Sequence, residues 1–201
     1  IIDSWDRAIK QTRALIDAKR QHKIILMQHL LTRRIRFPGF KDSWKSFRLS
    51  DLGDYYNGLS GKSKEDFGKG KPYIPYMNIL NNNSVDPNFM NYVMIKENEN
   101  QNKVNYGDFL FTSSSETPDE ICMSSVVLFE KDECYLNSFC FGFRLYDFET
   151  LSPEFARFYL RSQAFRRKVF PLAQGFTRYN ISKSSFRKIV IEIPALDEQK
   201  K

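Results

Sequence analysis

A long stretch without glycine or proline constrains the fold of this chain more than any other feature. Neither residue type occurs before Pro38, and good helix formers dominate residues 3–34. We therefore predict one helix over residues 3–34 within a helical segment 1–36, and about 30 helical residues would extend roughly 45 Å. The helix is expected to end at Phe37-Pro38-Gly39-Phe40, because proline cannot continue a helix and glycine permits a turn.

Apolar side chains recur along this predicted helix with the alternating three- and four-residue spacing of a coiled-coil seam. A helix of this length cannot bury its apolar stripe alone, so we expect it to pair with a second helix from the rest of the protein or from another copy. Polar positions within the seam set register and partner orientation at some cost in stability. The predicted interface residues are Trp5, Ile9, Thr12, Ile16, Leu26 and Leu30.

Residues 37–196 predict a separate globular domain of the α+β class, in which strands and helices mix. Short apolar runs predict strands over residues 109–112, 124–129, 139–145 and 189–193. The triplet Ser152-Pro153-Glu154 predicts a helix start, with a hydroxyl cap, an early proline and an early acid. The lysine-rich segment 55–71 predicts a mobile loop, and segment 73–77 an edge strand. Residues 197–201 are expected to begin a truncated further helix.

Basic charge is concentrated at the two ends of the chain. Residues 1–36 carry 9 Lys and Arg against 3 Asp and Glu, residues 37–150 carry 11 against 17, and residues 151–201 carry 11 against 4. Between Phe155 and Ile191 there are 9 basic residues and no acidic residue. This asymmetry favours a polyanionic partner, and the plainer alternative is a solvated basic helix face. In the helix predicted to start at Ser152-Pro153-Glu154, the cations are expected mostly on the outer side. They are Arg157, Arg161, Arg166, Arg167 and Lys168.

The sequence predicts no membrane span, because it has no apolar run of about 18 residues, and it shows no signal peptide or lipidation motif. The three cysteines, Cys122, Cys134 and Cys140, are odd in number and lack CxxC spacing, which favours a reducing cytoplasm and argues against a zinc site. The chain lacks a starting methionine, so we expect it to be a fragment of a longer cytoplasmic protein.

Three catalytic or nucleotide-binding signatures begin in this chain, and each is incomplete. Gly61-Lys62-Ser63 ends a phosphate-binding loop signature, but Tyr56 occupies the position of its first glycine. Asp86-Pro87-Asn88-Phe89 lacks the second proline of an amino-methyltransferase loop. Pro118-Asp119 is not followed by the carboxylate and lysine spacing of a metal-dependent nuclease. Since both histidines lie in the long helix, we predict no catalytic residue, no metal site and a chain that binds.

The remaining polar residues suit a nucleic acid. Lysines can neutralise phosphates, asparagine can pair with adenine and arginine with guanine, and small hydroxyls can hold sugar and phosphate. The stretch from Gly175 to Ser182 combines a glycine turn, a cation, a ring and an amide, and Ser182 is expected to cap a helix over residues 183–187. Within this set we favour Arg178 and Asn180 for base readout. The predicted contacts are Lys62, Ser63, Lys64, Lys69, Lys71, Asn78, Asn81, Ser113, Ser114, Ser115, Arg178, Tyr179, Asn180 and Lys183.

Taken in chain order, these segments resemble the specificity subunit of type I DNA restriction–modification systems. The resemblance covers nearly the whole chain, and its most specific parts are the Phe37-Pro38-Gly39-Phe40 linker and the Ile193-Pro194-Ala195-Leu196 ending with Glu198-Gln199. The other matching pieces are Leu30-Leu31-Thr32, Ile35-Arg36, Trp44, Leu52-Gly53-Asp54, Tyr73-Ile74-Pro75-Tyr76, Tyr106-Gly107-Asp108-Phe109-Leu110 and Asn180-Ile181-Ser182.

The resemblance implies a role in reading double-stranded DNA. In that family two target-recognition domains each read half of a split sequence, and two helices form an antiparallel coiled coil that spaces them. By this likeness the chain holds one spacer helix and the second target-recognition domain. DNA methyltransferase subunits using S-adenosylmethionine and a restriction and translocase subunit using ATP and Mg²⁺ supply the chemistry. No cofactor is therefore expected in this chain.

Other functions remain open from the sequence. One is a coiled-coil assembly module whose globular domain binds protein, for which the helix seam matters and the loop lysines do not. Another is a structure-specific nuclease, which the spacing after Pro118-Asp119 disfavours. RNA binding also fits the charge, but it has no support from the resemblance.

Overall fold

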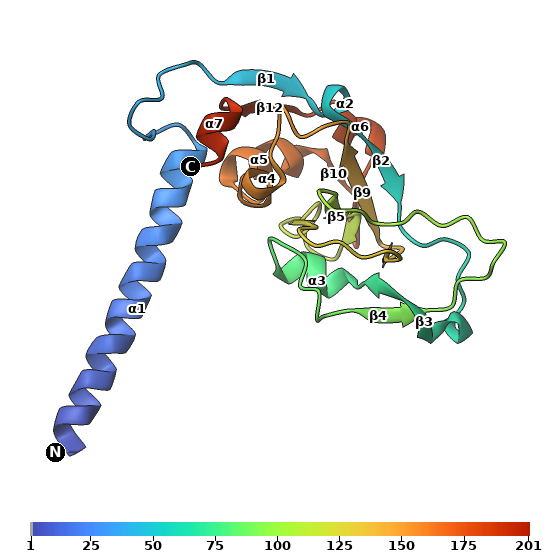
Figure 1. The fold of residues 1–201 in the computed structure, drawn as a ribbon, viewed down its shortest axis with the longest axis horizontal. Helices are drawn as coiled ribbons and strands as arrows, with labels where there is room; N and C mark the ends of the chain where they lie inside the picture. The colour runs from blue at the N-terminus through green and yellow to red at the C-terminus, as the bar shows by residue number, and fades with distance from the viewer. Residues whose placement is uncertain (1) are drawn as a thin grey trace. The chain divides into compact units, whose positions relative to one another are not determined.

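The computed structural model describes residues 2–201 (Figure 1). The chain divides into two compact units, Ile1–Phe40 and Lys41–Lys201. The first unit consists of helix α1, Ile2–Leu31, and the loop after it. Residue 1, where the predicted segment 1–36 begins, lies outside the described residues. Among residues 2–201, no helix has the length and apolar character required to cross a bilayer.

The predicted long helix is confirmed, and α1 contains 30 residues. It ends before the predicted residue 34, at a turn in which Arg33 adopts a left-handed φ of 62°. The Thr32 hydroxyl donates to the Gln28 carbonyl at 2.6 Å, and the Arg34 N–H donates to the His29 carbonyl at 2.9 Å. These bonds satisfy carbonyls that the last helical turn leaves open, so the helix ends without the help of Pro38.

A four-stranded antiparallel sheet forms the centre of the second unit. Its order is β2-β9-β5-β7, with bounds Gly53–Asn57, Cys140–Leu145, Phe109–Thr112 and Ser124–Val126. The predicted strand 109–112 is confirmed, and the predicted strands 124–129 and 139–145 form over shorter ranges. Alternate residues of an antiparallel strand face opposite sides, so the sheet offers one face of phenylalanines and one of smaller side chains.

The phenylalanine face is covered by helices from the C-terminal part of the chain. Phe109, Phe111, Phe141 and Phe143 are fully buried there. Phe186 of helix α6, Lys183–Arg187, packs edge-on against them, with ring centroids 4.8 Å from Phe111 and 5.0 Å from Phe141. Since edge-to-face contacts add to the burial of ring surface, Phe186 fixes α6 on the sheet.

The opposite face carries a second apolar cluster that includes Ile74, Ile79, Leu110 and Leu136. Gly142 lies on this face under the Tyr56 ring, and a Cβ atom at position 142 would lie 2.0 Å from the Tyr56 Cζ atom. Because both faces are buried, the strands carry apolar residues almost continuously rather than in strict alternation.

Three smaller sheets surround the central one. β1, Lys45–Arg48, pairs with β12, Val190–Ile193, and this pairing confirms the strand predicted over residues 189–193. β4, Asn91–Val93, and β8, Tyr135–Leu136, flank β3, Phe67–Ile74. The third sheet has the order β10-β11-β6, with bounds Ala173–Gln174, Tyr179–Ile181 and Ser114–Ser115.

Short helices connect these strands and complete the mixed helix and sheet architecture predicted from the sequence. The α-helices are α2 Leu49–Leu52, α3 Tyr76–Asn81, α4 Pro153–Tyr159, α5 Gln163–Val169, α6 Lys183–Arg187 and α7 Leu196–Gln199. The 3-10 helices are η1 Lys64–Asp66 and η2 Phe170–Leu172.

Two predicted segments have a different structure. Segment 55–71 is not a mobile loop, because it contains most of β2, η1 and the first part of β3. Segment 73–77 is not an edge strand: β3 lies between β4 and β8 and ends at Ile74. Pro75 instead occupies the N-cap of α3, where its missing N–H removes no helical hydrogen bond. Pro75 therefore stands at the start of a helix, and the prediction of a strand over residues 73–77 is wrong beyond Ile74.

The predicted basic helix is also divided. Ser152 accepts from the Phe155 N–H and caps α4 as expected, but a second N-cap at Ser162 begins α5. The Ser162 hydroxyl accepts from the Phe165 N–H at 3.3 Å. The extended backbone at Ser162, with a ψ of 158°, separates the two helices, so the predicted single helix is two short ones.

An ion pair between the half-exposed Arg144 and the buried carboxylate of Asp108 ties the end of β9 to the turn before β5. The Arg144 guanidinium donates from Nε and Nη2 to the two oxygens of Asp108, at 2.8 and 2.7 Å. Asp108 is buried, and it also accepts from the Tyr56 hydroxyl at 2.6 Å and from the Asn105 N–H at 2.8 Å. Burial and the nearby carboxylate raise the pKa of Tyr56 well above its ordinary value, so its hydroxyl remains a donor.

Replacing Asp108 by Ala is expected to lower the free energy of unfolding by about 1–3 kcal/mol, because the Tyr56 hydroxyl and the Asn105 N–H lose their acceptor, whereas the half-exposed Arg144 guanidinium can bind water instead. Urea unfolding followed by tryptophan fluorescence measures this change. The matched control is Glu133→Gln, which removes the negative charge of the solvent-accessible Lys71–Glu133 ion pair and should shift the midpoint little. Equal effects of the two substitutions would contradict the structural role assigned to Asp108.

Candidate nucleic-acid interface

A β-hairpin carries the stretch that the sequence singled out. Strands β10 and β11 pair with Gln174 opposite Asn180, and Gly175 to Arg178 form the turn. Gly175 has a φ of 123°, and a Cβ atom there would lie 2.1 Å from the Arg178 carbonyl oxygen. Only glycine fits this position without displacing the backbone, so the predicted glycine turn is confirmed.

The hairpin pairs with the serine segment 113–115, which lies far from it in the sequence. β11 lies antiparallel to β6, with Tyr179 opposite Ser115 and Asn180 opposite Ser114. The Tyr76 hydroxyl donates to the Ser114 carbonyl at 3.0 Å and holds β6 from the α3 side. Two predicted contact groups that are distant in sequence therefore form one continuous surface.

The serine hydroxyls mainly hold this surface together. Ser113 donates from its N–H and its Oγ to the Phe139 carbonyl, at 2.9 and 2.8 Å. Ser115 is buried and donates to Glu120 at 2.9 Å. The Ser114 Oγ is buried and makes no hydrogen bond to the described residues. The hydroxyls of Ser113 and Ser115 are therefore engaged inside the fold, and the sugar and phosphate contacts of the three serines stay predictions.

Arg178 and Asn180 are among the exposed donors of the hairpin. The Arg178 guanidinium lies over the Phe139 ring, with 5.6 Å between its Cζ atom and the ring centroid. The Asn180 amide donates to the Arg178 carbonyl at 3.3 Å and leaves its oxygen toward solvent. Tyr179 is half-buried between them. A planar cation held on an aromatic ring keeps its donor edge available to an acceptor.

Lys183 lies at the start of α6 and faces strand β2. Its ammonium donates to the Asn57 side-chain oxygen and lies 5.5 Å from the Tyr55 ring centroid. Arg187 contacts the same ring at 5.8 Å and approaches Asp54 at 3.8 Å. Burial lowers the pKa of Lys183 from its ordinary value. The predicted phosphate contact of Lys183 is therefore shared with an internal acceptor.

Ser182 occupies the predicted N-cap of α6, but its side chain caps no backbone N–H there. The Ser182 carbonyl accepts the Phe186 N–H at 2.9 Å, and its hydroxyl lies 2.6 Å from the Ser184 hydroxyl. The predicted helix over residues 183–187 is confirmed, and Ser182 contributes to it through its backbone.

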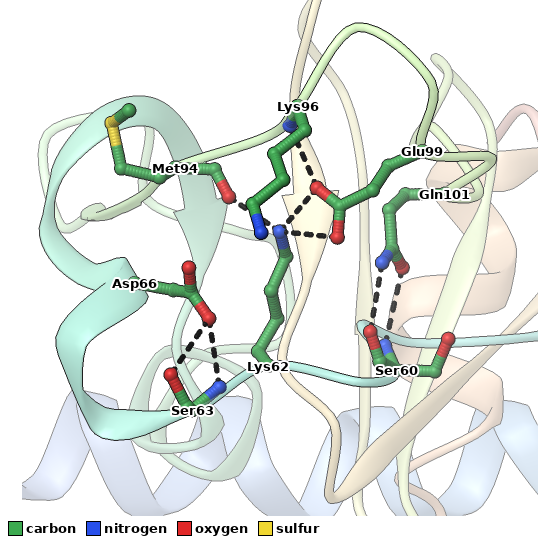
Figure 2. A network of polar contacts seen from close by, with 8 residues as sticks. All are labelled: Ser60, Lys62, Ser63, Asp66, Met94, Lys96, Glu99 and Gln101. Atoms are coloured by element: carbon green, nitrogen blue, oxygen red, sulfur yellow. Dashed lines mark hydrogen bonds and ion pairs between the residues drawn. The ribbon is translucent and has the colours of Figure 1, made fainter.

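Two of the predicted contacts, Lys62 and Ser63, form part of an internal clasp (Figure 2). Lys62 Nζ donates to Glu99 Oε1 at 2.7 Å and to the Met94 carbonyl, and the Lys62 side chain is only 4% exposed. The ammonium holds the pKa of Glu99 below its ordinary value. Ser63 forms a capping box with Asp66 at the start of η1. The expectation that these two side chains are free for phosphate is wrong, since both have internal partners.

The other predicted contacts are spread over the second unit. Lys64 and Lys69 are exposed on η1 and β3, and Lys71 forms an ion pair with Glu133. Asn81 is exposed at the end of α3. The expected base contact of Asn78 is wrong, because Asn78 is fully buried and its amide donates to the Asp86 and Phe89 carbonyls at 2.9 and 2.7 Å.

The predicted interface residues of α1 belong to the first unit. Trp5, Ile9, Ile16 and Leu26 are exposed to 68%, 48%, 44% and 40%, which leaves the apolar seam uncovered. Thr12 is exposed as well, and Leu30 is half-buried.

Two arginines expected on the outer face of the basic helix bind backbone carbonyls inside the fold. Arg161 donates to the Ile79 and Leu80 carbonyls, at 2.6 and 2.7 Å, and to the Ser124 carbonyl at 2.6 Å. The first two belong to the C-terminal part of α3, where a cation is favoured. Burial lowers the pKa of Arg161 to about 10, which leaves it charged at neutral pH.

Arg166 performs a similar function in the loop before β7. It donates to the carbonyls of Ile121, Cys122 and Asp119, at 2.7, 3.1 and 2.8 Å. Cys122 has a left-handed φ of 55°, so Arg166 holds a loop whose backbone is strained. Part of the basic charge between Phe155 and Ile191 is therefore internal, and Arg161 and Arg166 are exceptions to the expectation that the five helix cations project mostly outward.

Sequence reasoning missed three aromatic residues of this region. Phe139 is 54% exposed and supports Arg178, Phe176 is 99% exposed at the hairpin tip, and Tyr55 packs beside Lys183 and Arg187. The sequence did place Phe176 directly after Gly175 in the predicted turn, and a side chain at a turn tip can be exposed. Phe139 and Tyr55 join the site only through strand pairing, which the sequence does not reveal. No group of three His, Cys, Asp or Glu residues within 2–201 is arranged to hold a metal ion.

Replacing Arg161 by Met is expected to lower the free energy of unfolding by about 1.5–3 kcal/mol or more, because charged hydrogen bonds to three carbonyls are lost. Urea unfolding gives the value, and Arg167→Met on the exposed side of α5 is the matched control. A variant with unchanged stability and weakened binding of nucleic acid would show that Arg161 is a surface contact after all.

Comparison with known proteins agrees with the sequence resemblance. The family model described as the type I restriction modification DNA specificity domain matches residues 41–201. No curated protein matches the sequence.

Solved structures share the fold at low sequence identity. One, from a study of complex assembly and conformational transition in the type I R-M system, has a TM-score of 0.62 at 18% identity, and covers 98% of this chain and 46% of its own. The HsdS subunit from Thermoanaerobacter tengcongensis also has a TM-score of 0.62 at 18% identity, with coverages of 96% and 44%. The type I S subunit from M. genitalium has a TM-score of 0.51 at 14% identity, with coverages of 81% and 38%.

This chain therefore spans less than half the length of the solved chains it matches. The family model covers all of the second unit, including the central sheet, the hairpin and the serine segment. The chain belongs to the type I restriction modification DNA specificity domain family.

Proposed function

We propose that this chain reads one half of a bipartite double-stranded DNA target for a type I restriction–modification complex. The observation that carries the proposal is the surface of β11 and its turn, where Arg178 and Asn180 are exposed side by side. Arginine can donate two hydrogen bonds to guanine, and asparagine can pair with an adenine edge in the major groove. The family match supports DNA as the polyanion that this surface would bind.

Exposed cations elsewhere on the second unit would hold the DNA backbone. Lys64, Lys69 and Lys188 are exposed and add positive charge without reading sequence. Such contacts release counterions from DNA and supply affinity, whereas base-edge contacts supply specificity. We therefore assign base readout to Arg178 and Asn180 and backbone contacts to lysines outside the hairpin.

The long helix would act as the spacer between two recognition domains. Its exposed seam, Trp5, Ile9, Ile16 and Leu26, is the surface that a second helix would cover. That helix would come from the rest of the protein or from another copy, and pairing would fix the gap between the two half-sites. The seam spacing supports this proposal.

The chemistry of the complex would belong to partner subunits. DNA methyltransferase subunits would bind S-adenosylmethionine, and a restriction and translocase subunit would use ATP and Mg²⁺, while this chain would choose the site without a cofactor. The proposed compartment is the cytoplasm. It suits the three free buried cysteines, among which burial raises the pKa of Cys134 to about 11 and keeps its thiol unreactive.

In the assembled methyltransferase complex, Arg178→Ala and Asn180→Ala should each reduce discrimination against single-base variants of the target by about 1–3 kcal/mol. Arg178→Ala should also lower the slope of log affinity against log salt by about 1, because one cation is removed. Titration of labelled duplexes at several salt concentrations measures both quantities, with Lys131→Ala as a control on an exposed cation elsewhere.

An alternative function is a coiled-coil assembly module whose second unit binds protein, and the uncovered seam of α1 favours it. The same experiment separates the two functions. Loss of target choice with an intact complex supports DNA readout. Unchanged target choice in both variants, with disrupted assembly when Ile9 and Ile16 are replaced by Asp, would support the assembly module alone.

A further inference from the structure

The most exposed apolar side chain of the second unit lies at the tip of the β10–β11 hairpin. Phe176 is 99% exposed, whereas the next most exposed aromatic residue of that unit, Tyr146, is 65% exposed. A scattered apolar residue at a surface is ordinary, but a ring with almost no internal contact contributes nothing to the fold. Phe176 is therefore available to a partner that has an apolar surface.

The backbone around Phe176 gives the ring a defined position. Gly175 adopts a left-handed φ that places the next residue at the turn, and the pairing of Gln174 with Asn180 closes the hairpin beneath it. β11 is further held by β6 through Ser114 and Ser115. The tip thus projects from a three-stranded sheet that is anchored on its far side.

The neighbours of Phe176 define the chemistry of its partner. Arg178 follows two residues later on the Phe139 ring, and Asn180 presents an exposed amide. No acidic residue occurs between Phe155 and Ile191. A partner that meets this tip must combine negative charge, hydrogen-bonding edges and flat apolar faces, and a stacked nucleic acid has all three.

We propose that Phe176 is a wedge that enters between two adjacent base pairs of the target and partly unstacks them. Apolar side chains that enter between base pairs partly unstack them and kink the duplex. Arg178 and Asn180, at the base of the turn, would then reach the base edges next to the opened step. This inference rests on the proposed DNA recognition and adds a second source of sequence choice.

The wedge predicts which step the hairpin selects. Pyrimidine–purine steps such as TA and CA/TG unstack and kink most easily. The free energy needed to insert Phe176 therefore depends on the base step, although Phe176 makes no hydrogen bond to the bases. The half-site of this domain should therefore contain such a step beside the bases contacted by Arg178 and Asn180. Replacing it by a stiffer step should weaken binding by the unaltered protein more than binding by a Phe176→Ala variant.

The test uses the assembled complex and a duplex with the motif that the complex methylates, identified beforehand from methylated genomic DNA. 2-Aminopurine is placed at each step of the half-site in turn, and bending is followed by energy transfer between dyes at the duplex ends. The unaltered complex should raise 2-aminopurine fluorescence at one step. Phe176→Ala should abolish that signal, reduce bending and weaken binding about 10- to 100-fold, the scale of stacking between a base and an aromatic ring.

Three comparisons keep the result specific. The salt slope should be the same for Phe176→Ala and the unaltered protein, because no charge is removed. Phe176→Leu should retain part of the bending, since a wedge needs an apolar body. Tyr146→Ala, which removes the other highly exposed ring of the unit, should leave the fluorescence signal unchanged.

The outcomes separate the wedge from the DNA recognition on which it rests. Specific binding by the unaltered complex without unstacking or bending at any step overturns the wedge alone. Failure of Phe176→Ala to assemble with the methyltransferase subunits places the ring in a protein interface and also overturns it. If the unaltered complex shows no specific DNA binding, the proposed function fails together with the wedge.

Discussion

The packing of Phe186 on the phenylalanine face of the central sheet fixes the geometry of the candidate interface. Its ring lies edge-on to Phe111, Phe141 and Phe143, and the chain reaches α6 directly from β11. Because this anchor is immobile, the hairpin has one defined exit from the core. The β10–β11 hairpin is short and polar and has little core of its own, so it depends on this anchor to hold its exposed side chains in place. Base readout needs donors whose positions are fixed in this way.

The basic residues of this chain have two roles: some bind backbone carbonyls inside the fold, and others face outward. The net charge does not separate these roles. Arg161 and Arg166 each donate hydrogen bonds to several backbone carbonyls of the fold. Carbonyl oxygens thus take the place of carboxylates, which explains how a segment without acidic residues can bury cations. Arg178 has an exposed ring beneath it and no carbonyl partner of this kind in the described residues, and this difference marks it as the outward-facing cation.

Local features of the structure could be predicted from the sequence, and non-local ones could not. The long helix, the strand at 109–112, the glycine turn at Gly175 and the helix after Ser182 each depend on neighbours in the chain. The burial of Asn78, the clasp of Lys62 with Glu99, and the pairing of β6 with β11 depend on residues far apart in sequence. Polar residues such as Lys62 and Asn78 look alike in a sequence whether they face solvent or an internal partner, so only part of the predicted contact set is exposed.

The central claim is that the hairpin of this chain chooses bases in one half of a split target. The most direct measurement is the methylated motif of genomic DNA from cells that carry either the unaltered chain or the doubly substituted Arg178→Ala, Asn180→Ala chain in the complete system. The account predicts a bipartite motif in which one half relaxes while the other half and the gap stay the same. A motif that is unchanged in both halves, from a complex that still assembles and methylates, would contradict it.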